Sequence, residues 1–265
     1  MKITIIGCGW LGLPLLESLV AAKHTVWGTG RREENLVAIT AAGGKAFRVD
    51  LPKNFFGAVF GGQDLVVITL PPGGRRLGPK ATTAYLETLA PLAPLFKGKN
   101  EAHVLYTSST GVYGAAAGAV DEQGAMMPDT HSGRAVVAAE AWLREQTDRL
   151  TVLRLAGLIG PDRHPGTFYG GKDRAIPMAD APINLVHRDD VITAVHTLIA
   201  AGLPAGTFNV CAAAHPAKGD YYTAMSNQLG LTIAGTETGG AEGKVVVSDR
   251  LRGLGWKPGC DDLAI

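Results

Sequence analysis

The sequence is poor in features that would indicate a metalloprotein or a nucleic-acid-binding protein. Its three cysteines, Cys8, Cys211 and Cys260, form no CxxC pair or Cys/His cluster, so we do not expect a metal site. So few and widely spaced cysteines are typical of a protein in the reducing cytoplasm. Lysine and arginine number 25 against 24 acidic residues, which leaves no excess of positive charge to attract nucleic acid or an anionic membrane surface. We therefore expect a cytoplasmic protein whose partner is a small molecule.

Long apolar runs are also scarce. Residues 3–22 are mostly apolar, but three glycines and Glu17 interrupt them, which is unlike a secretory or membrane-spanning helix. Glycine, by contrast, is abundant at 35 residues, well above its usual share. This excess predicts many tight turns and close approaches between backbone segments.

The first part of the chain alternates between short β-branched apolar segments and helical patterns. Strands are expected over 2–7, 24–29, 45–50, 64–70, 103–109 and 150–156, and helices over 11–22, 32–42, 80–95 and 133–148. Nearly continuous apolar strands that alternate with helices are typical of a parallel sheet covered on both faces. The pattern predicts an α/β protein with a doubly wound parallel sheet, the Rossmann fold.

The regular alternation of strand and helix patterns ends after residue 157. Residues 157–183 are rich in Gly, Pro, Asp and His and are expected to form a loop, followed by strands at 183–187, 206–210 and 244–247 and helices at 190–201 and 218–229. We predict a dinucleotide-binding domain over 1–160. A small, discontinuous substrate lobe is predicted over 161–265, above the carboxyl edge of the sheet, with parts of 183–210 returning to that sheet.

A glycine-rich turn joins the first expected strand to the first expected helix. It reads Gly7-Cys8-Gly9-Trp10-Leu11-Gly12, a GxGxxG pattern in its required strand–turn–helix context. In such turns the first glycine permits the bend, the second lets the backbone approach phosphate, and the third lets helix and strand pack closely. The helix N-terminus adds partial positive charge. The turn predicts binding of the pyrophosphate of a nicotinamide dinucleotide.

The end of the second strand bears on which dinucleotide is bound. An NAD site usually places Asp or Glu here to bind the ribose 2′-hydroxyl, but this chain has Arg31 and Arg32, and the first carboxylate is Glu33. A guanidinium suits phosphate because its planar fork reaches two oxygens. The sequence favours NADP(H), with NAD(H) as the alternative.

Two more strand ends are expected to border the cofactor. Asp50 and Leu51 follow the third strand, where a carboxylate can accept from an adenine amino group, although an isolated Asp there is equally typical of a plain turn. Leu70 and Pro71 follow the fourth strand, in a loop that borders the cofactor ribose in this fold. The same loop continues to Arg75-Arg76, which are candidates for contact with a phosphate or a substrate carboxylate.

Several segments together resemble the extended, NAD(P)-dependent epimerase/dehydratase-like branch of the short-chain dehydrogenase/reductase superfamily. They read HVLYTSSTGVYG (103–114), SGRAVVAAE (132–140), LRLAGLIGP (153–161), LVHRDDV (185–191) and GKVVVSDRLRGLGWKPG (243–259). In that family a Ser or Thr binds the substrate oxygen, a Tyr transfers the proton, and a Lys lowers the Tyr pKa and binds the nicotinamide ribose. The resemblance places the Ser at Ser109, but it puts Ser132 at the Tyr position and Val136 at the Lys position. The chain therefore resembles an atypical member that lacks the Tyr-x-x-x-Lys pair.

Other side chains are candidates to replace the missing proton relay. His131 adjoins the vacant Tyr position and His164 lies in the loop after the sixth strand, and imidazole titrates near neutrality. Tyr113 and Arg134 are candidate substrate contacts. Arg163 and Lys172 lie near His164 in sequence and indicate an anionic substrate.

The resemblance leaves two hypotheses open. The first is an NADP(H)-dependent oxidoreductase or epimerase-like enzyme that acts on a small, anionic carbonyl or sugar-derived compound with a non-standard proton donor. The alternative is a catalytically inactive dinucleotide-binding sensor or regulatory protein. His187 and Asp190 are expected to order a strand–helix corner, with Asp190 as a helix cap. The apolar residues of 133–148 permit a homodimer.

Overall fold

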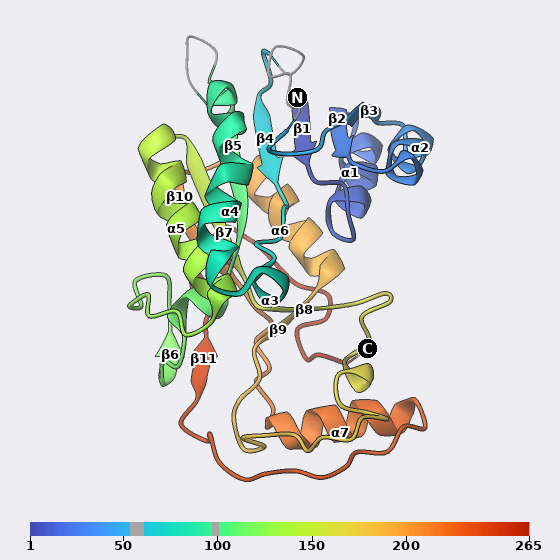
Figure 1. Cartoon of the computed structure of the whole chain (residues 1–265), viewed down its shortest axis with the longest axis vertical. Coiled ribbons are helices and arrows are strands. Elements are labelled where there is room, and N and C mark those ends of the chain that lie inside the picture. The colour runs from blue at the N-terminus through green and yellow to red at the C-terminus, as the bar shows by residue number, and fades with distance from the viewer. Residues whose placement is uncertain (54–60, 97–100, 265) are drawn as a thin grey trace. The chain divides into compact units, whose positions relative to one another are not determined.

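The computed structural model describes residues 1–53, 61–96 and 101–264 (Figure 1). These residues form two compact units, each assembled from three segments of the chain. Unit 1 comprises Met1–Val112, Pro128–Arg154 and Leu198–Thr207, and unit 2 comprises Tyr113–Met127, Leu155–Thr197 and Phe208–Ile265. The predicted division at residue 160 stays a prediction.

A seven-stranded sheet has the strand order β10-β7-β5-β4-β1-β2-β3. The strand pairs from β5 to β3 are parallel, and the order β3-β2-β1-β4-β5-β7 is that of a Rossmann sheet. The predicted fold class is confirmed. The strands are β1 Lys2–Ile6, β2 Thr25–Gly30, β3 Lys45–Arg48, β4 Leu65–Ile68, β5 His103–Ser109, β7 Leu150–Leu155 and β10 Gly206–Val210.

The helices predicted for the first part of the chain are present, with small shifts at their ends. They are α1 Gly12–Ala21, α2 Glu33–Ala41, α4 Ala81–Leu89 and α5 His131–Gln146. The expected helix 80–95 is shorter than predicted, because Pro91 and Pro94 convert its end into a 3₁₀ segment, Ala90–Leu95. Figure 1 shows α4 and α5 side by side, and the two helices pack on each other.

The core of unit 1 follows from the apolar strands. All four residues of β4 and most of β1 are buried, as expected for parallel strands covered on both faces. From α1, Leu15, Leu16 and Leu19 are buried, spaced so that they share one face of the helix. This packing holds the segments that follow β1, β2 and β4.

Unit 2 contains two small parallel sheets. In one, β6 Gly118–Val120 pairs with β11 Lys244–Val246, and in the other, β8 Gly157–Ile159 pairs with β9 Leu185–His187. The prediction of loop throughout 157–183 was wrong for β8, because its partner lies far along the chain. The helices of this region are α6 Arg188–Ala200, which is shared between the units, α7 Lys218–Gln228 and α8 Asp249–Arg252.

Short elements without long-range periodicity escaped prediction. They are β6, α8, α3 Gly74–Leu77 and the 3₁₀ segments Gly78–Lys80, Thr110–Tyr113 and Pro165–Thr167. Elements of three or four residues are too short to carry a periodic signal. Within the described ranges, no helix has both the length and the apolar character needed to cross a membrane.

Candidate functional site

The glycine turn of unit 1 is tied to the ends of two neighbouring strands. Gly7 has φ +106°, and its N–H donates to Thr29 Oγ1 at 2.9 Å, while Cys8 N–H donates to the Thr29 carbonyl at 2.9 Å. The Thr69 hydroxyl, just after β4, donates to the Gly7 carbonyl at 2.6 Å. The turn is thereby fixed at the carboxyl ends of β1, β2 and β4, where an open α/β sheet reverses its strand order and binds ligands.

The three glycines of this turn differ in what a side chain would meet. A Cβ on Gly12 would overlap the carbonyl oxygen of Gly7, and Gly7 itself has a backbone conformation that L residues rarely adopt. At Gly9, however, no heavy atom of the described residues, other than its chain neighbours, lies within 4 Å of the Cβ position. Trp10 is half-buried, Leu11 is buried, and α1 begins at Gly12. The backbone at Gly9 thus faces open space, which suits the close approach of a pyrophosphate.

The end of β2 carries a cluster of charges. Arg31 and Arg32 are both exposed, and Arg32 precedes the first helical residue without capping the helix through its side chain. The Arg32 guanidinium lies 3.7 Å from the Glu34 carboxylate. From β3, Arg48 forms an ion pair with Glu33 and donates to the Arg31 carbonyl at 3.0 Å. The contacts of Arg48 could not be predicted from the sequence, because the parallel register that pairs it with Gly30 is a tertiary property.

The other predicted cofactor contacts lie in short loops. Asp50 and Leu51 follow β3, both half-buried, and the Asp50 carbonyl accepts from Lys53 N–H at 2.8 Å in a turn. Leu70 follows β4 and its carbonyl accepts from the Tyr85 hydroxyl at 2.7 Å, while Pro71 is exposed. Leu70 belongs to unit 1 at the switch point of the sheet.

A close contact between α3 and α5 concerns Ser132. A Cβ on Gly74, the first residue of α3, would overlap the Ser132 hydroxyl and backbone. Gly73, which precedes α3, has φ +67°, so the loop needs both glycines to reach α5. The backbone of Gly74 therefore packs against Ser132, which is half-buried. Arg75 and Arg76, the next two residues, are exposed.

The start of α5 explains the positions of two predicted residues. The Thr130 hydroxyl accepts from Gly133 N–H at 3.0 Å, so the helix begins at His131, two residues earlier than predicted. Arg134 donates to the Pro128 carbonyl and to His131 Nδ1, both at 3.3 Å. Since a guanidinium only donates, the neutral His131 ring has its proton on Nε2.

Ser109 ends β5, as the resemblance implies. Its hydroxyl oxygen accepts from Gly111 N–H at 3.1 Å, and the side chain is half-buried. One and two turns along α5 from Ser132, Val136 and Glu140 are buried. That Ser132 and Val136 stand at the family's Tyr and Lys positions stays a prediction from the motifs.

Glu140 anchors α5 to the sheet. Arg154 of β7 donates to both of its carboxylate oxygens, at 3.1 and 2.8 Å, and the Ser108 hydroxyl of β5 donates at 2.6 Å. Burial raises the pKa of the Glu140 carboxyl, but the bonds and charge of Arg154, with help from Ser108 and Arg144, outweigh it and hold the pKa below its usual value. Glu140 ends the segment 132–140 that carries the resemblance, but its ion pair with Arg154 could not be predicted from the sequence, because the two residues lie on different elements.

The remaining predicted residues lie in unit 2. The Tyr113 side chain is fully buried and its hydroxyl donates to Asn209 Oδ1 at 2.7 Å, so its surroundings give no support to the predicted substrate contact. His164 Nδ1 accepts from Gly166 N–H at 3.1 Å and begins a 3₁₀ turn, which leaves the proton of the neutral ring on Nε2. Arg163 is exposed, as is Lys172, whose ammonium donates to the Phe168 carbonyl at 3.1 Å.

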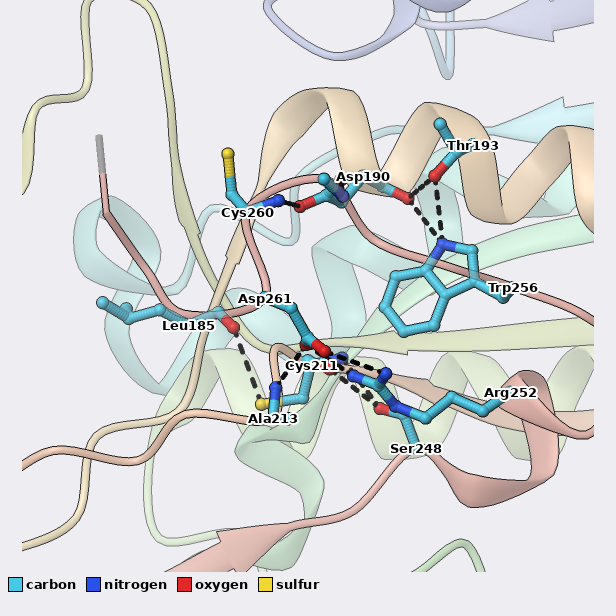
Figure 2. Close-up of polar contacts among 11 residues, drawn as sticks. Leu185, Asp190, Thr193, Cys211, Ala213, Ser248, Arg252, Trp256, Cys260 and Asp261 are labelled. Carbon is cyan, nitrogen blue, oxygen red and sulfur yellow. Dashed lines mark hydrogen bonds and ion pairs between the residues drawn. The ribbon is translucent and has the colours of Figure 1, made fainter.

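Asp190 differs from its predicted role. Figure 2 shows its carboxylate toward the C-terminal segment, where it accepts from the N–H groups of Gly259 and Cys260. The indole N–H of Trp256 donates to the Asp190 carbonyl at 3.1 Å. The prediction that Asp190 caps its own helix was wrong, because that role falls to His187, whose Nδ1 accepts from Asp189 N–H at 3.2 Å.

The fold has well-matched relatives among solved structures. UDP-glucuronic acid 4-epimerase from Bacillus cereus, in complex with NAD, superposes with a TM-score of 0.80 at 16% identity and covers 98% of this chain and 94% of its own. A Methylobacillus flagellatus protein provisionally assigned as an NAD-dependent epimerase/dehydratase has a TM-score of 0.76 at 26% identity over 98% and 94% of the two chains. The chain thus shares the Rossmann-type fold of these epimerase and epimerase/dehydratase-like proteins.

Comparison with curated protein sequences identifies a family for this chain. Protein YeeZ of Escherichia coli strain K12 is 37% identical over 239 residues, which span 87% of this chain and 84% of YeeZ. The chain belongs to the YeeZ family. No family model matches the sequence. The parts of the chain that the structure describes contain no group of three or more His, Cys, Asp or Glu side chains arranged to hold a metal ion.

Proposed function

We propose that this chain binds NADP(H) and is an oxidoreductase or epimerase-like enzyme acting on a small, anionic carbonyl or sugar-derived compound. The observation that carries the proposal is the open position at Gly9, in a turn tied to the end of β2. The NAD complex of the Bacillus cereus epimerase, which shares this fold, supports a nicotinamide dinucleotide as the ligand class. The preference for NADP(H) rests on Arg31 and Arg32.

Different residues of unit 1 bind different parts of the dinucleotide. The backbone from Gly7 to Gly12 holds the pyrophosphate beside the N-terminus of α1. Arg31 binds the 2′-phosphate, because Arg32 already has a carboxylate neighbour in Glu34. When bound, the nicotinamide supplies hydride transfer.

Proton transfer falls to a histidine in this proposal. Serine has no pKa near neutrality and valine has none at all, so Ser132 and Val136 do not reproduce a Tyr–Lys relay. His131 and His164 each accept a hydrogen bond at Nδ1, which leaves an Nε2–H to donate when the ring is neutral. Ser109 supplies the hydroxyl for the substrate oxygen.

Exposed cations supply the substrate's counter-charge. In unit 1 these are Arg75 and Arg76, which Gly74 places on the start of α5. In unit 2 they are Arg163 and Lys172. A substrate with a carboxylate or phosphate fits either group.

A second candidate, a dinucleotide-binding sensor without turnover, is favoured by one observation. The backbone of α3 packs against Ser132, the residue that the motifs place at the family's Tyr position. A protein that keeps the glycine turn but has backbone packed against this residue would bind its cofactor without needing to turn it over. The two candidates therefore share the ligand and differ in chemistry.

Titration with NADP⁺ and NAD⁺ tests the shared part. We expect tighter binding of NADP⁺, and in Arg31→Ala a loss of at least tenfold for NADP⁺ with little change for NAD⁺, because charged hydrogen bonds to a phosphate are lost. Equal affinities for both cofactors would contradict the preference, and failure to bind either would contradict the site.

Oxidation of NADPH by stoichiometric protein, followed at its absorbance band with a panel of anionic carbonyl compounds, separates the two candidates. Turnover that is lost in His131→Ala or His164→Ala supports the enzyme. Tight binding with no oxidation across the panel supports the sensor.

A further inference from the structure

We infer that Arg48 supports the preference for NADP(H) by neutralising Glu33, the first carboxylate after β2, whose charge would otherwise disfavour a 2′-phosphate bound by Arg31. The inference rests on the proposed binding of a dinucleotide at the glycine turn. It assigns a positioning role to a β3 residue that makes no contact with the cofactor in this scheme.

Three contacts bring Arg48 to the end of β2. The parallel register pairs it with Gly30, and Val49 N–H donates to the Gly30 carbonyl at 3.0 Å. The Arg48 guanidinium donates to the Arg31 carbonyl at 3.0 Å and forms its ion pair with Glu33. The same side chain therefore fixes the backbone of Arg31 and occupies the neighbouring carboxylate.

The start of α2, to which Glu33 belongs, is held against β2 and the glycine turn. Asn35 donates from Nδ2 to the Cys8 carbonyl at 3.4 Å. A Cβ on Gly30 would lie only 2.8 Å from the Asn35 Cβ, so β2 and α2 are in direct contact here. In a Rossmann fold an acidic residue at the end of the second strand binds the ribose 2′-hydroxyl. Glu33 lies three residues beyond the end of β2 and carries the first carboxylate after that strand, and an unpaired negative charge there disfavours a 2′-phosphate.

Two of the three arginines at the end of β2 and on β3 pair with a carboxylate of α2, and the third does not. Arg48 pairs with Glu33 and Arg32 pairs with Glu34, whereas Arg31 has no ion-pair partner among the residues described. Both carboxylates of the first turn of α2 are therefore engaged, and Arg31 is left for the 2′-phosphate. Without Arg48, Glu33 would be a free negative charge beside that phosphate.

The test is a double-mutant cycle read out by the ratio of the dissociation constants for NADP⁺ and NAD⁺. Arg48→Met removes the charge and keeps the length of the side chain, so Glu33 is unmasked and the ratio shifts toward NAD⁺. The side chains of Arg48 and Glu33 are 52% and 70% exposed, so we expect about a fivefold shift, the size typical of an exposed pair. Glu33→Gln added to Arg48→Met should restore the wild-type ratio.

Lys45→Met is the matched control. Lys45 is an exposed cation on the same strand, but its ammonium lies 4.6 Å from the Trp27 ring centroid, and Glu33 forms its ion pair with Arg48 instead. We expect this variant to leave the ratio within twofold of wild type, which would exclude a general effect of net charge.

Different failures point to different errors. If Arg48→Met leaves the ratio unchanged, if Lys45→Met shifts it equally, or if Glu33→Gln does not restore it, the role assigned to Arg48 is wrong while the proposed function stands. If wild-type protein binds neither dinucleotide, the proposed function is wrong and the role of Arg48 with it.

Discussion

Gly9 and Gly12 lie three residues apart, yet a methyl group would have opposite consequences at the two positions. At Gly12 it would overlap the Gly7 carbonyl, which belongs to the backbone and is fixed by Thr69. At Gly9 it would meet no protein atom. The first position is thus governed by packing within the fold and the second by the space left for a ligand.

This difference makes a prediction at the residue scale. Gly12→Ala should lower the free energy of unfolding by about 1–3 kcal/mol, the usual cost of overpacking. Gly9→Ala should change it by less than about 0.5 kcal/mol but weaken dinucleotide binding at least tenfold, because the methyl group occupies the phosphate's space. Denaturant titration and cofactor titration measure the two effects. A Gly9→Ala variant that binds normally would show that the pyrophosphate lies elsewhere.

At the scale of elements, α5 is fixed by one buried ion pair. Glu140 and Arg154 are both almost fully buried, and Arg154 contacts both carboxylate oxygens. Removing one partner of such a pair leaves the other as an uncompensated buried charge. The position of the α5 residues Ser132 and Val136 therefore depends on a contact two turns away.

We expect Glu140→Gln to lower the free energy of unfolding by about 3–5 kcal/mol. Because the folded pKa of Glu140 is depressed, its contribution is present above the unfolded pKa and is lost as the pH falls through the folded one. Glu145→Gln is the control: the same substitution on the exposed side of α5, with an expected change of less than about 0.5 kcal/mol. Equal effects of the two variants would contradict the anchoring role.

The short helix α3 shows where prediction of elements fails. The sequence Pro72-Gly73-Gly74 indicates a loop, and locally it is one. The first residue of the helix that follows, Gly74, packs against Ser132, nearly sixty positions further along the chain. Backbone freedom at the glycines permits that contact, but the position of α5 creates it.

At the scale of the whole molecule, His103 couples folding to pH. Its Nε2 lies 2.7 Å from the Thr151 hydroxyl, which in turn donates to the Pro204 carbonyl at 2.8 Å, so the contact joins β5, β7 and the segment before β10. Burial, with the positive charge of Arg149, lowers the pKa of His103 from 6.5 to about 4.

The sign of the resulting pH dependence is fixed. Between pH 6.5 and 4 the unfolded chain binds a proton that the folded chain excludes, so stability falls as the pH falls, by up to about 1.4 kcal/mol per pH unit from this group. Denaturant unfolding of wild type and His103→Gln from pH 7.5 to 4.5 measures the effect. We expect a flatter profile for the variant, and parallel profiles would contradict a buried neutral His103.

Prediction from sequence succeeded where the information lies within a few neighbouring residues. The alternation of apolar strands and helices and the strand–turn–helix context of the glycine turn follow from periodicity and turn chemistry, and the structure confirms them. The cofactor and substrate roles of individual residues stay predictions. The predicted capping role of Asp190 was wrong, because its carboxylate oxygens accept from backbone N–H groups of a segment nearly seventy residues further along the chain.

What the sequence by itself determined is a Rossmann sheet with a GxGxxG turn and two arginines after its second strand. Only the tertiary structure decided that Arg48 pairs with Glu33, that α3 packs against Ser132 and that β8 pairs with β9. The physical reason is the separation along the chain over which each kind of interaction acts. Backbone propensity and side-chain period act between near neighbours, whereas an ion pair or a backbone contact between distant segments depends on strand order, register and packing that the whole chain sets together.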